Sequence, residues 1–184
     1  RPLRSRTLRK GDRMRKLVFG INVTIDGCCD HTKGIPDSEV HDYFKQELKD
    51  SGTLLYGRKT YELMVPFWPS VAKNPEGHSK DMVDFAQAFV SVPQIVVVSR
   101  SLKKVEDKNT SIIHSNLKEE ILKLKQQPGK NISVGGVDLP SQLIELGLVD
   151  EIQLVVHPVV AGKGRRLFDS IDLHESLGFK LSQS

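Results

Sequence analysis

The sequence predicts an α/β fold of three layers, α-β-α, with a mostly parallel central sheet and an antiparallel edge at the C-terminus. Short runs rich in β-branched residues alternate along the chain with segments whose apolar residues recur at helical spacing. Several of these runs are apolar on both sides, as strands covered by helices on two faces are. At 184 residues the chain is long enough to bury one core of this kind.

Strands are expected wherever these runs occur. The first is Leu17–Ile25, which ends at a turn formed by Asp26-Gly27; the others are 53–56, 93–98, 111–114, 132–134, 151–156 and a last short one at 178–181. The last of these lies at the C-terminus, where the antiparallel edge is expected.

Helices are expected between the strands, where start signals precede apolar residues at i, i+3 and i+4. The first helix is expected to start at Asp37 or Ser38 and to bury Val40, Tyr43, Phe44 and Leu48. Later helices are expected to start at Thr60, at about Ser79 and at Asn116, where Glu119 completes a capping-box-like signal. A last helix is expected to bury Leu139, Leu143 and Leu146 on one face. The segment Met64–Gly77 contains three prolines and is expected to be irregular. Within it, Phe67 and Trp68 could anchor a loop on the core or form a wall of a substrate pocket.

Charge is concentrated at the N-terminus. Residues 1–13 hold six of the 27 Lys and Arg residues and one of the 23 acids, so residues 14–184 are nearly neutral. We interpret 1–13 as a tag or an upstream extension, and 14–184 as a single domain. Nucleic-acid binding would depend on the arm alone, and no apolar run reaches the ~18 residues of a membrane helix, so neither partner is expected.

Cysteine and histidine usage argues against a metal site. Cys28 and Cys29 are adjacent, and none of the six histidines pairs with another at i, i+4. Two neighbouring cysteines cannot form an ordinary structural disulfide, which favours a reducing compartment such as the cytoplasm.

Three junctions after predicted strands suit phosphate groups. Gly57 permits close approach, Arg58 and Lys59 carry positive charge, and Thr60 could bond a phosphate oxygen and cap the helix. Gly135-Gly136 likewise precedes a helix, and Ser99-Arg100 could hold a phosphate monoester such as the 2′-phosphate of NADPH. Each is, by itself, compatible with an ordinary turn. Together they would lie at the carboxyl edge of one parallel sheet, where ligands bind.

The order of these motifs resembles the dihydrofolate-reductase-like superfamily, and most closely the C-terminal reductase domain of the bifunctional riboflavin-biosynthesis deaminase/reductase. The resemblance covers roughly 14–168 and rests on Thr24-Ile25-Asp26-Gly27, Gly57-Arg58-Lys59-Thr60-Tyr61, Val98-Ser99-Arg100, Val134-Gly135-Gly136 and His157-Pro158 with Gly162-Lys163-Gly164. It implies an NADPH-dependent reductase that transfers hydride to a C=N or C=O of a small heterocyclic or sugar-phosphate substrate. It also implies a homodimer.

Carried over to this chain, the resemblance assigns the cofactor's phosphates to Gly57, Arg58, Lys59 and Thr60. It assigns the 2′-phosphate to Ser99 and Arg100, the pyrophosphate to Gly135 and Gly136, and the nicotinamide to the surroundings of Asn22 and Val23. Asp26 is then the nearest group to orient the substrate or relay a proton, together with Asn22. The other interpretation of Asp26 is a turn residue in Asp-Gly.

Two alternatives stay open. Dihydrofolate reductases carry an acid in the first helix, but here that position falls on Val40 or His41, with Glu39 and Asp42 on other faces. A non-catalytic NADPH-binding protein would use the same phosphate contacts without turnover.

Overall fold

The computed structural model describes residues 14–34, 37–105, 107–171, 178 and 180. Within these residues the strands are β1 (Leu17–Thr24), β2 (Ser51–Gly57), β3 (Ile95–Val98), β4 (Thr110–Ile113), β5 (Asn131–Gly135) and β6 (Glu151–His157). The helices are α1 (Ser38–Lys49), α2 (Arg58–Lys73), α3 (Lys80–Ser91), α4 (Leu117–Gln126) and α5 (Asp138–Glu145). No helix of this described part has both the length and the apolar character to cross a membrane.

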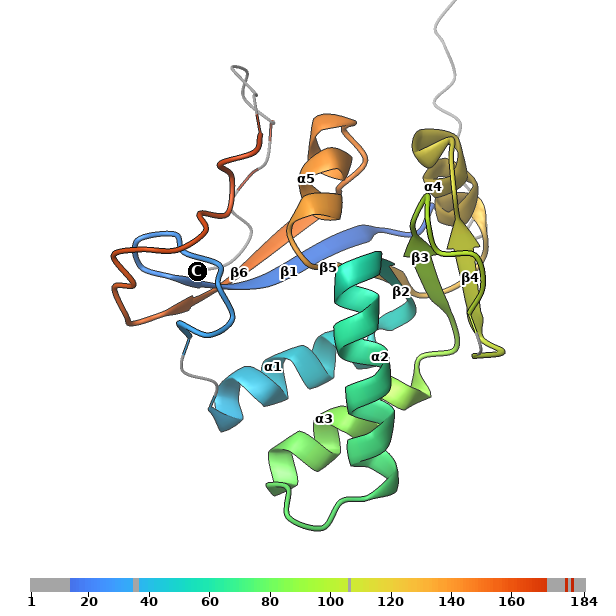
Figure 1. Cartoon of the computed structure of the whole chain (residues 1–184). Helices are drawn as coiled ribbons and strands as arrows, with labels where there is room; N and C mark the ends of the chain where they lie inside the picture. The colour runs from blue at the N-terminus through green and yellow to red at the C-terminus, as the bar shows by residue number, and fades with distance from the viewer. Residues whose placement is uncertain (1–13, 35–36, 106, 172–177, 179, 181–184) are drawn as a thin grey trace, which may run out of the picture.

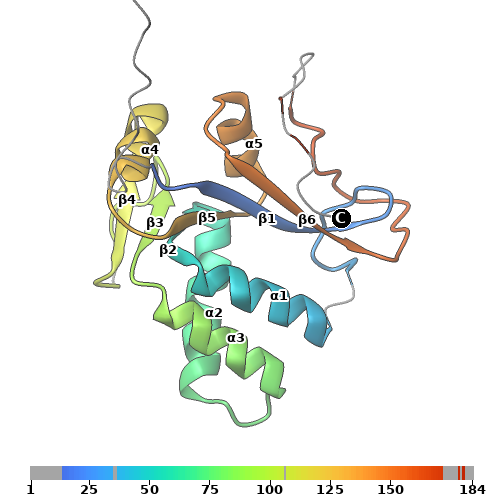
Figure 2. The same ribbon diagram turned by 180° about the vertical axis from the view of Figure 1, so that it is seen from behind.

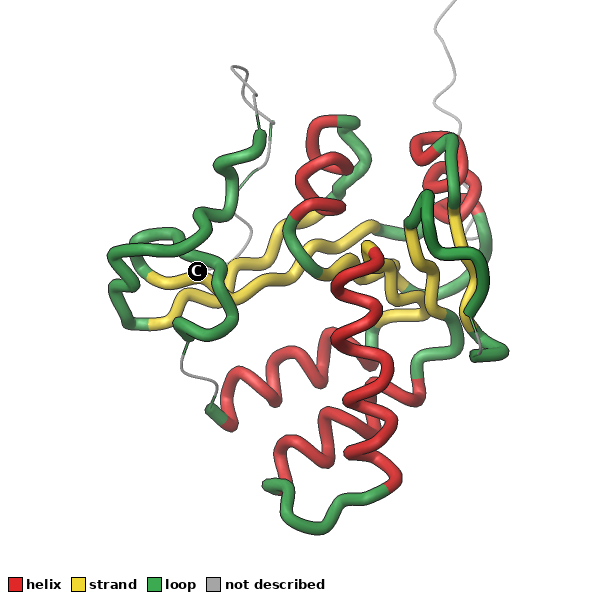
Figure 3. Tube along the Cα trace, viewed as in Figure 1, coloured by secondary structure: helices red, strands yellow, loops and turns green. Residues whose placement is uncertain are grey.

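The strands form one sheet in the order β4-β3-β2-β5-β1-β6, and every pairing between them is parallel. Helices α1, α2 and α3 cover one face, and α4 and α5 cover the other (Figures 1 and 2). The three layers are plain when the trace is coloured by secondary structure (Figure 3). The expected antiparallel edge is not found among these strands; the expected strand at 178–181 falls largely outside the described residues.

Two hydrophobic cores lie on opposite faces of the sheet, and the alternation of side chains along each strand feeds both. Leu55 of β2 and Val96 of β3 join the core under α4 and α5. Their neighbours Leu54 and Val97 join the core against α1, α2 and α3. This two-sided burial is why the strands are apolar at consecutive positions.

Helix α2 is longer than expected. It runs to Lys73 through Pro66 and Pro69, so the expectation of an irregular segment from residue 64 is wrong over most of its length. Each interior proline removes a backbone hydrogen bond. Packing of Val65 and Val71 into buried positions, with Trp68 against α3, offsets that loss.

Of the smaller expectations about the helices, one is confirmed and two are wrong. Asp37 does cap α1, accepting the Val40 N–H at 2.9 Å. Asn116, by contrast, has a left-handed backbone (φ 53°) and no capping side-chain bond, so the capping box is absent. Tyr43 and Leu146, expected inside, are 43% and 38% exposed; Leu146 follows the last residue of α5.

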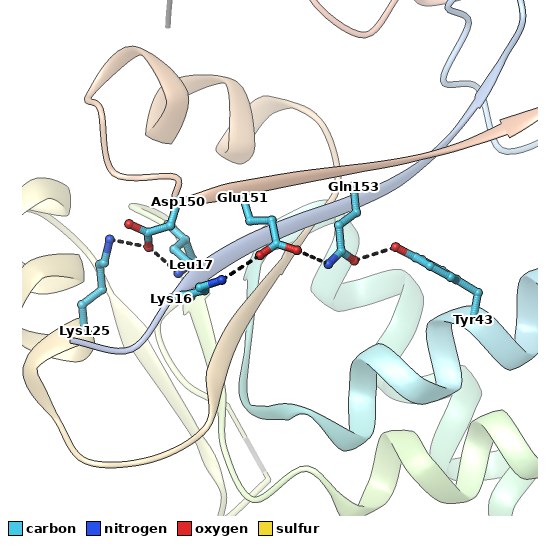
Figure 4. A network of polar contacts seen from close by, with 7 residues as sticks. All are labelled: Lys16, Leu17, Tyr43, Lys125, Asp150, Glu151 and Gln153. Atoms are coloured by element: carbon cyan, nitrogen blue, oxygen red, sulfur yellow. Dashed lines mark hydrogen bonds and ion pairs between the residues drawn. The ribbon is translucent and has the colours of Figure 1, made fainter. Parts of the chain in front are cut away.

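A chain of polar contacts fixes the amino ends of β1 and β6 (Figure 4). The buried ammonium of Lys125 on α4 donates to Asp150 at 2.6 Å, and Asp150 accepts the Leu17 N–H at 2.7 Å. Next to it, Lys16 pairs with Glu151 at 3.1 Å. Glu151 accepts from Gln153, which in turn accepts from Tyr43 of α1. These contacts tie the amino ends of β1 and β6 to α4 and α1, while the parallel backbone pairing from Val18 to Thr24 sets the register of the two strands.

Candidate functional site

The chain reverses its direction of travel between β2 and β5, two neighbouring strands. From β2 it continues toward β3 on one side, and from β5 toward β6 on the other. Helix α2 leaves β2 on one face, and α5 follows β5 on the other (Figure 1). In open parallel sheets this reversal point, at the carboxyl ends of the strands, is where ligands bind.

Two helix N-termini meet at this point without side-chain caps. Helix α2 begins at Arg58 after Gly57, and α5 begins at Asp138 after Val137; neither preceding residue makes a capping side-chain bond. The first backbone N–H groups of both helices are therefore available to an anion, and both helix dipoles favour one there.

Gly136 and Thr60 lie against each other across the gap between the two strands. Gly136 has φ +89°, and a Cβ on it would come 2.5 Å from Thr60 Oγ1. Gly135 pairs with Tyr56 in the sheet, and a Cβ on Gly135 would come 2.7 Å from the Tyr56 ring. The glycine pair is thus required by backbone conformation at one position and by packing at both.

Gly57 differs from this pair, because neither its backbone conformation nor its packing requires glycine. Its φ is −73°, a value open to any residue, and a Cβ there would meet only Leu139 at 3.8 Å. Its backbone conformation therefore does not need glycine, and the space beside it stays open. The expected capping role of Thr60 is wrong, because α2 begins two residues earlier and Gly57 holds the cap position.

Arg58 connects the ends of β2 and β3. Its guanidinium pairs with Glu62 one turn along α2 (2.6 Å) and donates to Ser101 Oγ (3.0 Å). All three side chains are exposed. Ser101 was not singled out in the sequence, yet it lies with Arg58 at the edge where the cofactor's phosphates were expected.

The first turn of α5 carries a second group of charges. Asp138 pairs with Arg165 from the loop after β6. The hydrogen bond from Arg165 lowers the pKa of Asp138, and the positive charges of Arg165 and Lys59 act in the same direction. Lys59 and Arg165 therefore both lie near the α5 N-terminus, although Asp138 already offsets part of their charge.

Ser99 and Arg100 follow β3, beside the end of β2. The Ser99 hydroxyl is buried and accepts the backbone N–H groups of Ser101 (3.3 Å) and Leu102 (3.1 Å), so it shapes the turn. Arg100 is exposed at the same edge. The structure therefore leaves the Arg100 side chain accessible to a ligand, while the Ser99 hydroxyl is engaged within the protein.

The sheet opens between β1 and β5 just beyond the glycine pair. These strands pair only from Leu17 to Phe19, whereas β1 stays paired with β6 as far as Thr24. Asn22 and Val23 lie on this stretch, which has no strand partner on the β5 side among the residues that the structure describes. Backbone groups there are available to hydrogen-bond a bound ring or amide.

A hollow of about 70 Å³ adjoins the opening, at the carboxyl ends of β1 and β6. It is lined by Asn22, Val23, Thr24, Cys28, Asp30, His31, Gly34 and His157. The His157 ring is buried and its Nε2 lies 3.1 Å from Asn22 Oδ1. Because an amide oxygen only accepts, Nε2 carries the hydrogen in this contact. In the sequence, His157 belonged to one of the motifs of the resemblance and was given no role in the site, and nothing there linked it to Asn22.

Asp26 is engaged within the protein. Its carboxylate accepts from Thr24 Oγ1 (2.5 Å) and from the backbone of Ala161 and Gly162 (both 3.0 Å), and it pairs with Arg166 at 3.1 Å. The Thr24 hydroxyl bond, followed by the others, holds the pKa of Asp26 far below its ordinary value. This geometry fits the turn-residue interpretation, in which Asp26 ties the turn after β1 to the loop after β6; its proposed catalytic role stays a prediction.

Phe67 and Trp68 lie away from the hollow. Trp68 faces α3, where its ring packs against Phe85 at 4.4 Å between ring centroids, and the exposed Phe67 contacts Trp68 at 4.9 Å. Neither residue lines the hollow. The structure thus packs Trp68 against the core from within helix α2, not from a loop, and does not bring this pair to the other candidate residues; a role in a substrate pocket stays a prediction.

The first helix sends no carboxylate into the hollow. His41 pairs with Asp81 of α3, on the far side of α1 from the site. The carboxyl group of α1 that reaches the sheet is Glu47, which accepts from Ser133 Oγ at 2.6 Å; burial raises the pKa of Glu47. A Cβ on Gly20 would lie 2.9 Å from Glu47 Oε2, so this group sits under β1.

Among the described residues, no three His, Cys, Asp or Glu side chains come together as ligands for an ion.

Comparison with known proteins finds one matching family model and two similar relatives. The family model described as the RibD C-terminal domain matches residues 15–184. The protein YyaP of Bacillus subtilis (strain 168) is 34% identical over 173 residues, covering 92% of this chain and 87% of its own. YwjB of the same strain is 25% identical over 180 residues, covering 90% of each chain. Both relatives are described as uncharacterized.

A crystal structure from Shewanella sp. PV-4, of a candidate riboflavin biosynthesis protein, superimposes with a TM-score of 0.61. It shares 16% sequence identity and covers 86% of this chain and 85% of its own. At that identity the likeness concerns the fold.

Proposed function

Because this chain belongs to the RibD C-terminal domain family, we propose that it is a reductase that uses NADPH. The observation that carries the proposal is the meeting of two uncapped helix N-termini at the point where the chain reverses between β2 and β5. The pyrophosphate of a dinucleotide carries negative charge at the middle of the molecule. Backbone N–H groups at helix N-termini are the donors that bind it in folds of this kind.

The residues at this edge fit NADPH in order along the sheet. The backbone at Gly135 and Gly136, with Thr60 beside it, would hold the pyrophosphate together with the start of α2. Arg100, at the end of β3, would hold the 2′-phosphate, with Arg58 nearby through Ser101. The nicotinamide would enter the opening beside residues 20–24 of β1, next to Asn22 and Val23.

Bound there, NADPH supplies hydride for a polarised C=N or C=O carbon. The protein's contribution is to hold the acceptor close to the donor and to limit water around both. Asn22 keeps its amide N–H groups for a substrate oxygen or ring nitrogen, because its Oδ1 faces His157. His157, held by that contact, would fix the substrate's orientation at the floor of the hollow.

We infer a substrate of the riboflavin-pathway type, a small heterocycle or a sugar phosphate. Asp30 and His31 supply polar groups to the lining of the hollow. Hydrogen bonds from Thr32 lower the pKa of Asp30, so this carboxylate stays charged and favours donor-rich substrates. Dihydrofolate is the alternative, but it is less well supported because α1 offers no carboxylate to the hollow.

A homodimer remains part of the proposal. Leu154 and Val156 of β6, an edge strand in the described sheet, are 46% and 55% exposed, and Val160 beyond them is 69% exposed. Apolar side chains gathered on one edge are typical of a surface that a second subunit covers. Light scattering coupled to size exclusion measures the mass in solution; a monomer at all concentrations would contradict this part.

The decisive experiment has two stages. Binding of NADPH and NADH is first measured by nicotinamide fluorescence, and the complex is then mixed with candidate acceptors while nicotinamide absorbance is followed. Oxidation with a phosphoribosylamino-pyrimidine supports the proposal, and oxidation with dihydrofolate supports the alternative. Tight NADPH binding without turnover of any acceptor would favour a non-catalytic NADPH-binding protein. Failure to bind NADPH would refute the proposal.

A further inference from the structure

A buried arginine lies at the opposite edge of the sheet, at the amino ends of the strands. Arg15 precedes β1, and its side chain is 6% exposed. Its Nε donates to the Lys130 carbonyl at 2.5 Å, and its Nη2 donates to Thr53 Oγ1 at 2.7 Å and to the Asn131 carbonyl at 3.4 Å. These contacts use one side of the guanidinium; Nη1 makes no such bond to the described residues.

Arg15 also lacks a carboxylate partner within the part of the chain that the structure describes. The contrast with Lys125 is direct: that cation is equally buried, and it pairs with Asp150 (Figure 4). Around Arg15 the acceptors are two carbonyls and a hydroxyl, all neutral. Burial without a negative partner lowers the pKa of Arg15. A buried cation of this kind is best satisfied by an anion from outside.

The guanidinium borders a groove of about 480 Å³, within the size range of small-molecule sites. It is lined by Arg15, Leu48, Lys49, Ser51, Gly52, Ser91, Pro93, Gln94, Gln127, Pro128, Gly129 and Lys130. Three of these residues are cations, several more offer hydroxyl or amide donors, and none is an acid. Two glycines stand closest to the guanidinium: a Cβ would come 3.2 Å from it at Gly52 and 3.4 Å at Gly129.

The three cations are not equivalent. Lys49 is exposed and is also attracted by the carboxylate of Asp84 on α3. Lys130 is exposed, and its ammonium uses one donor on the Lys49 carbonyl at 2.7 Å, which leaves two for a ligand. Lys130 and the free Nη1 of Arg15 are therefore the pair best placed to hold a negative group.

We propose that this groove is a second ligand site, distinct from the carboxyl edge, and that it binds a compact oxyanion, a phosphate group or a carboxylate, through Arg15 and Lys130. Nη1 contacts the anion end-on, because Nε and Nη2 are held by the protein. Lys130 closes over it from the groove's rim.

The test follows backbone amides by NMR in the full chain while inorganic phosphate, or malonate in a second series, replaces chloride at constant ionic strength. The Gly52 and Gly129 amides report on the groove, and that of Gly136 on the cofactor edge. We expect saturable shifts at Gly52 and Gly129 with at least one anion, which also tells phosphoryl from carboxylate ligands. These shifts persist when NADPH saturates the other edge.

Lys130→Gln should weaken that binding at least about fivefold, because one charged donor is lost. Lys123→Gln removes an exposed lysine that pairs with Glu120 on α4, and it should leave the affinity unchanged. Arg15 itself is a poor test position, since its loss also breaks structural bonds. Shifts that do not saturate, that occur only at Gly136 or at Gly11 in the basic arm, or that are equal in the Lys130 variant would overturn the proposal.

Discussion

The hydroxyl of Thr60 and the Cα of Gly136 close the gap between β2 and β5 at the carboxyl edge of the sheet. No side chain fits between them, since a Cβ on Gly136 would lie 2.5 Å from Thr60 Oγ1. The backbone of the turn after β5 is therefore held against the first turn of α2. This contact sets how near the two helix N-termini come to each other, and so the shape of the proposed pyrophosphate site.

Gly136→Ala should lower both stability and NADPH affinity. The added methyl group meets Thr60, and φ +89° is unfavourable for alanine, so we expect a loss of about 1–3 kcal/mol in the free energy of unfolding. Urea unfolding measures it. Gly57→Ala is the matched control: with φ −73° and room for a Cβ, it loses only the preference for glycine over alanine at an N-cap, so its stability should fall by less than about 1 kcal/mol. Equal losses in the two variants would contradict the strain argument.

Arg100→Ala should separate the two nicotinamide cofactors. If Arg100 holds the 2′-phosphate, the dissociation constant for NADPH rises about tenfold or more, and that for NADH changes little. Fluorescence titration of both cofactors provides the comparison. Lys104→Ala, an exposed cation in the same loop, controls for the general loss of charge. The assignment is wrong if NADPH and NADH weaken by the same factor.

Asp26→Asn should reduce stability in a pH-dependent way. Because the folded protein lowers the pKa of Asp26, its carboxylate stabilises the fold above the unfolded-state pKa of about 4, and this contribution is lost as the pH falls toward the folded-state value. The variant lacks this titration. The gap between the two unfolding midpoints should thus be constant near pH 7 and shrink below about pH 4. A gap that stays constant in acid would show that Asp26 does not titrate in this way.

Local patterns predicted the elements and the junctions well. Leu54-Leu55-Tyr56 was recognised as a strand because both faces of β2 are buried, and Gly135-Gly136 as a turn because no other residue type suits it. The position of β5 between β1 and β2, by contrast, was not predicted. It depends on pairings between residues more than 70 positions apart, such as Tyr56 with Gly135, and periodicity carries no information about them.

The errors have the same origin. Pro66 and Pro69 indicated an irregular segment, but packing of Trp68 on Phe85 outweighs their local preference. The contact between Asn22 and His157 was not predicted because these residues are 135 positions apart and meet only through the parallel register of β1 and β6. The turn at Asp26, in contrast, was predicted correctly, because its signal is the local Asp-Gly pair.

Trp68→Ala should destabilise the protein without changing how it binds small molecules. The ring packs against Phe85 in the core between α2 and α3, so truncation should cost about 3 kcal/mol or more. Phe67→Ala removes a neighbouring ring that is 45% exposed and should cost less than about 1 kcal/mol. If either variant changed KM for the acceptor while leaving stability intact, the pair would belong to the substrate pocket after all.

Asn22→Ala should impair turnover more than cofactor binding. The substitution removes the oxygen that faces His157 Nε2, so the ring at the floor of the hollow loses the contact that orients it. We expect kcat with the best acceptor to fall by roughly tenfold to a hundredfold, as loss of a positioning contact does, while NADPH affinity stays within about threefold. Asn22→Asp keeps an acceptor oxygen and should retain more of the activity.

The matched control for Asn22→Ala is Gln153→Ala. It removes a polar side chain from the same face of the sheet, but one that contacts Tyr43 and Glu151 rather than the hollow. Its kcat should equal that of the unmodified protein. If Asn22→Ala kept full turnover, or if both variants lost the same activity, the effect would come from the sheet as a whole. The hollow beside β1 and β6 would then not be the place where the acceptor is held.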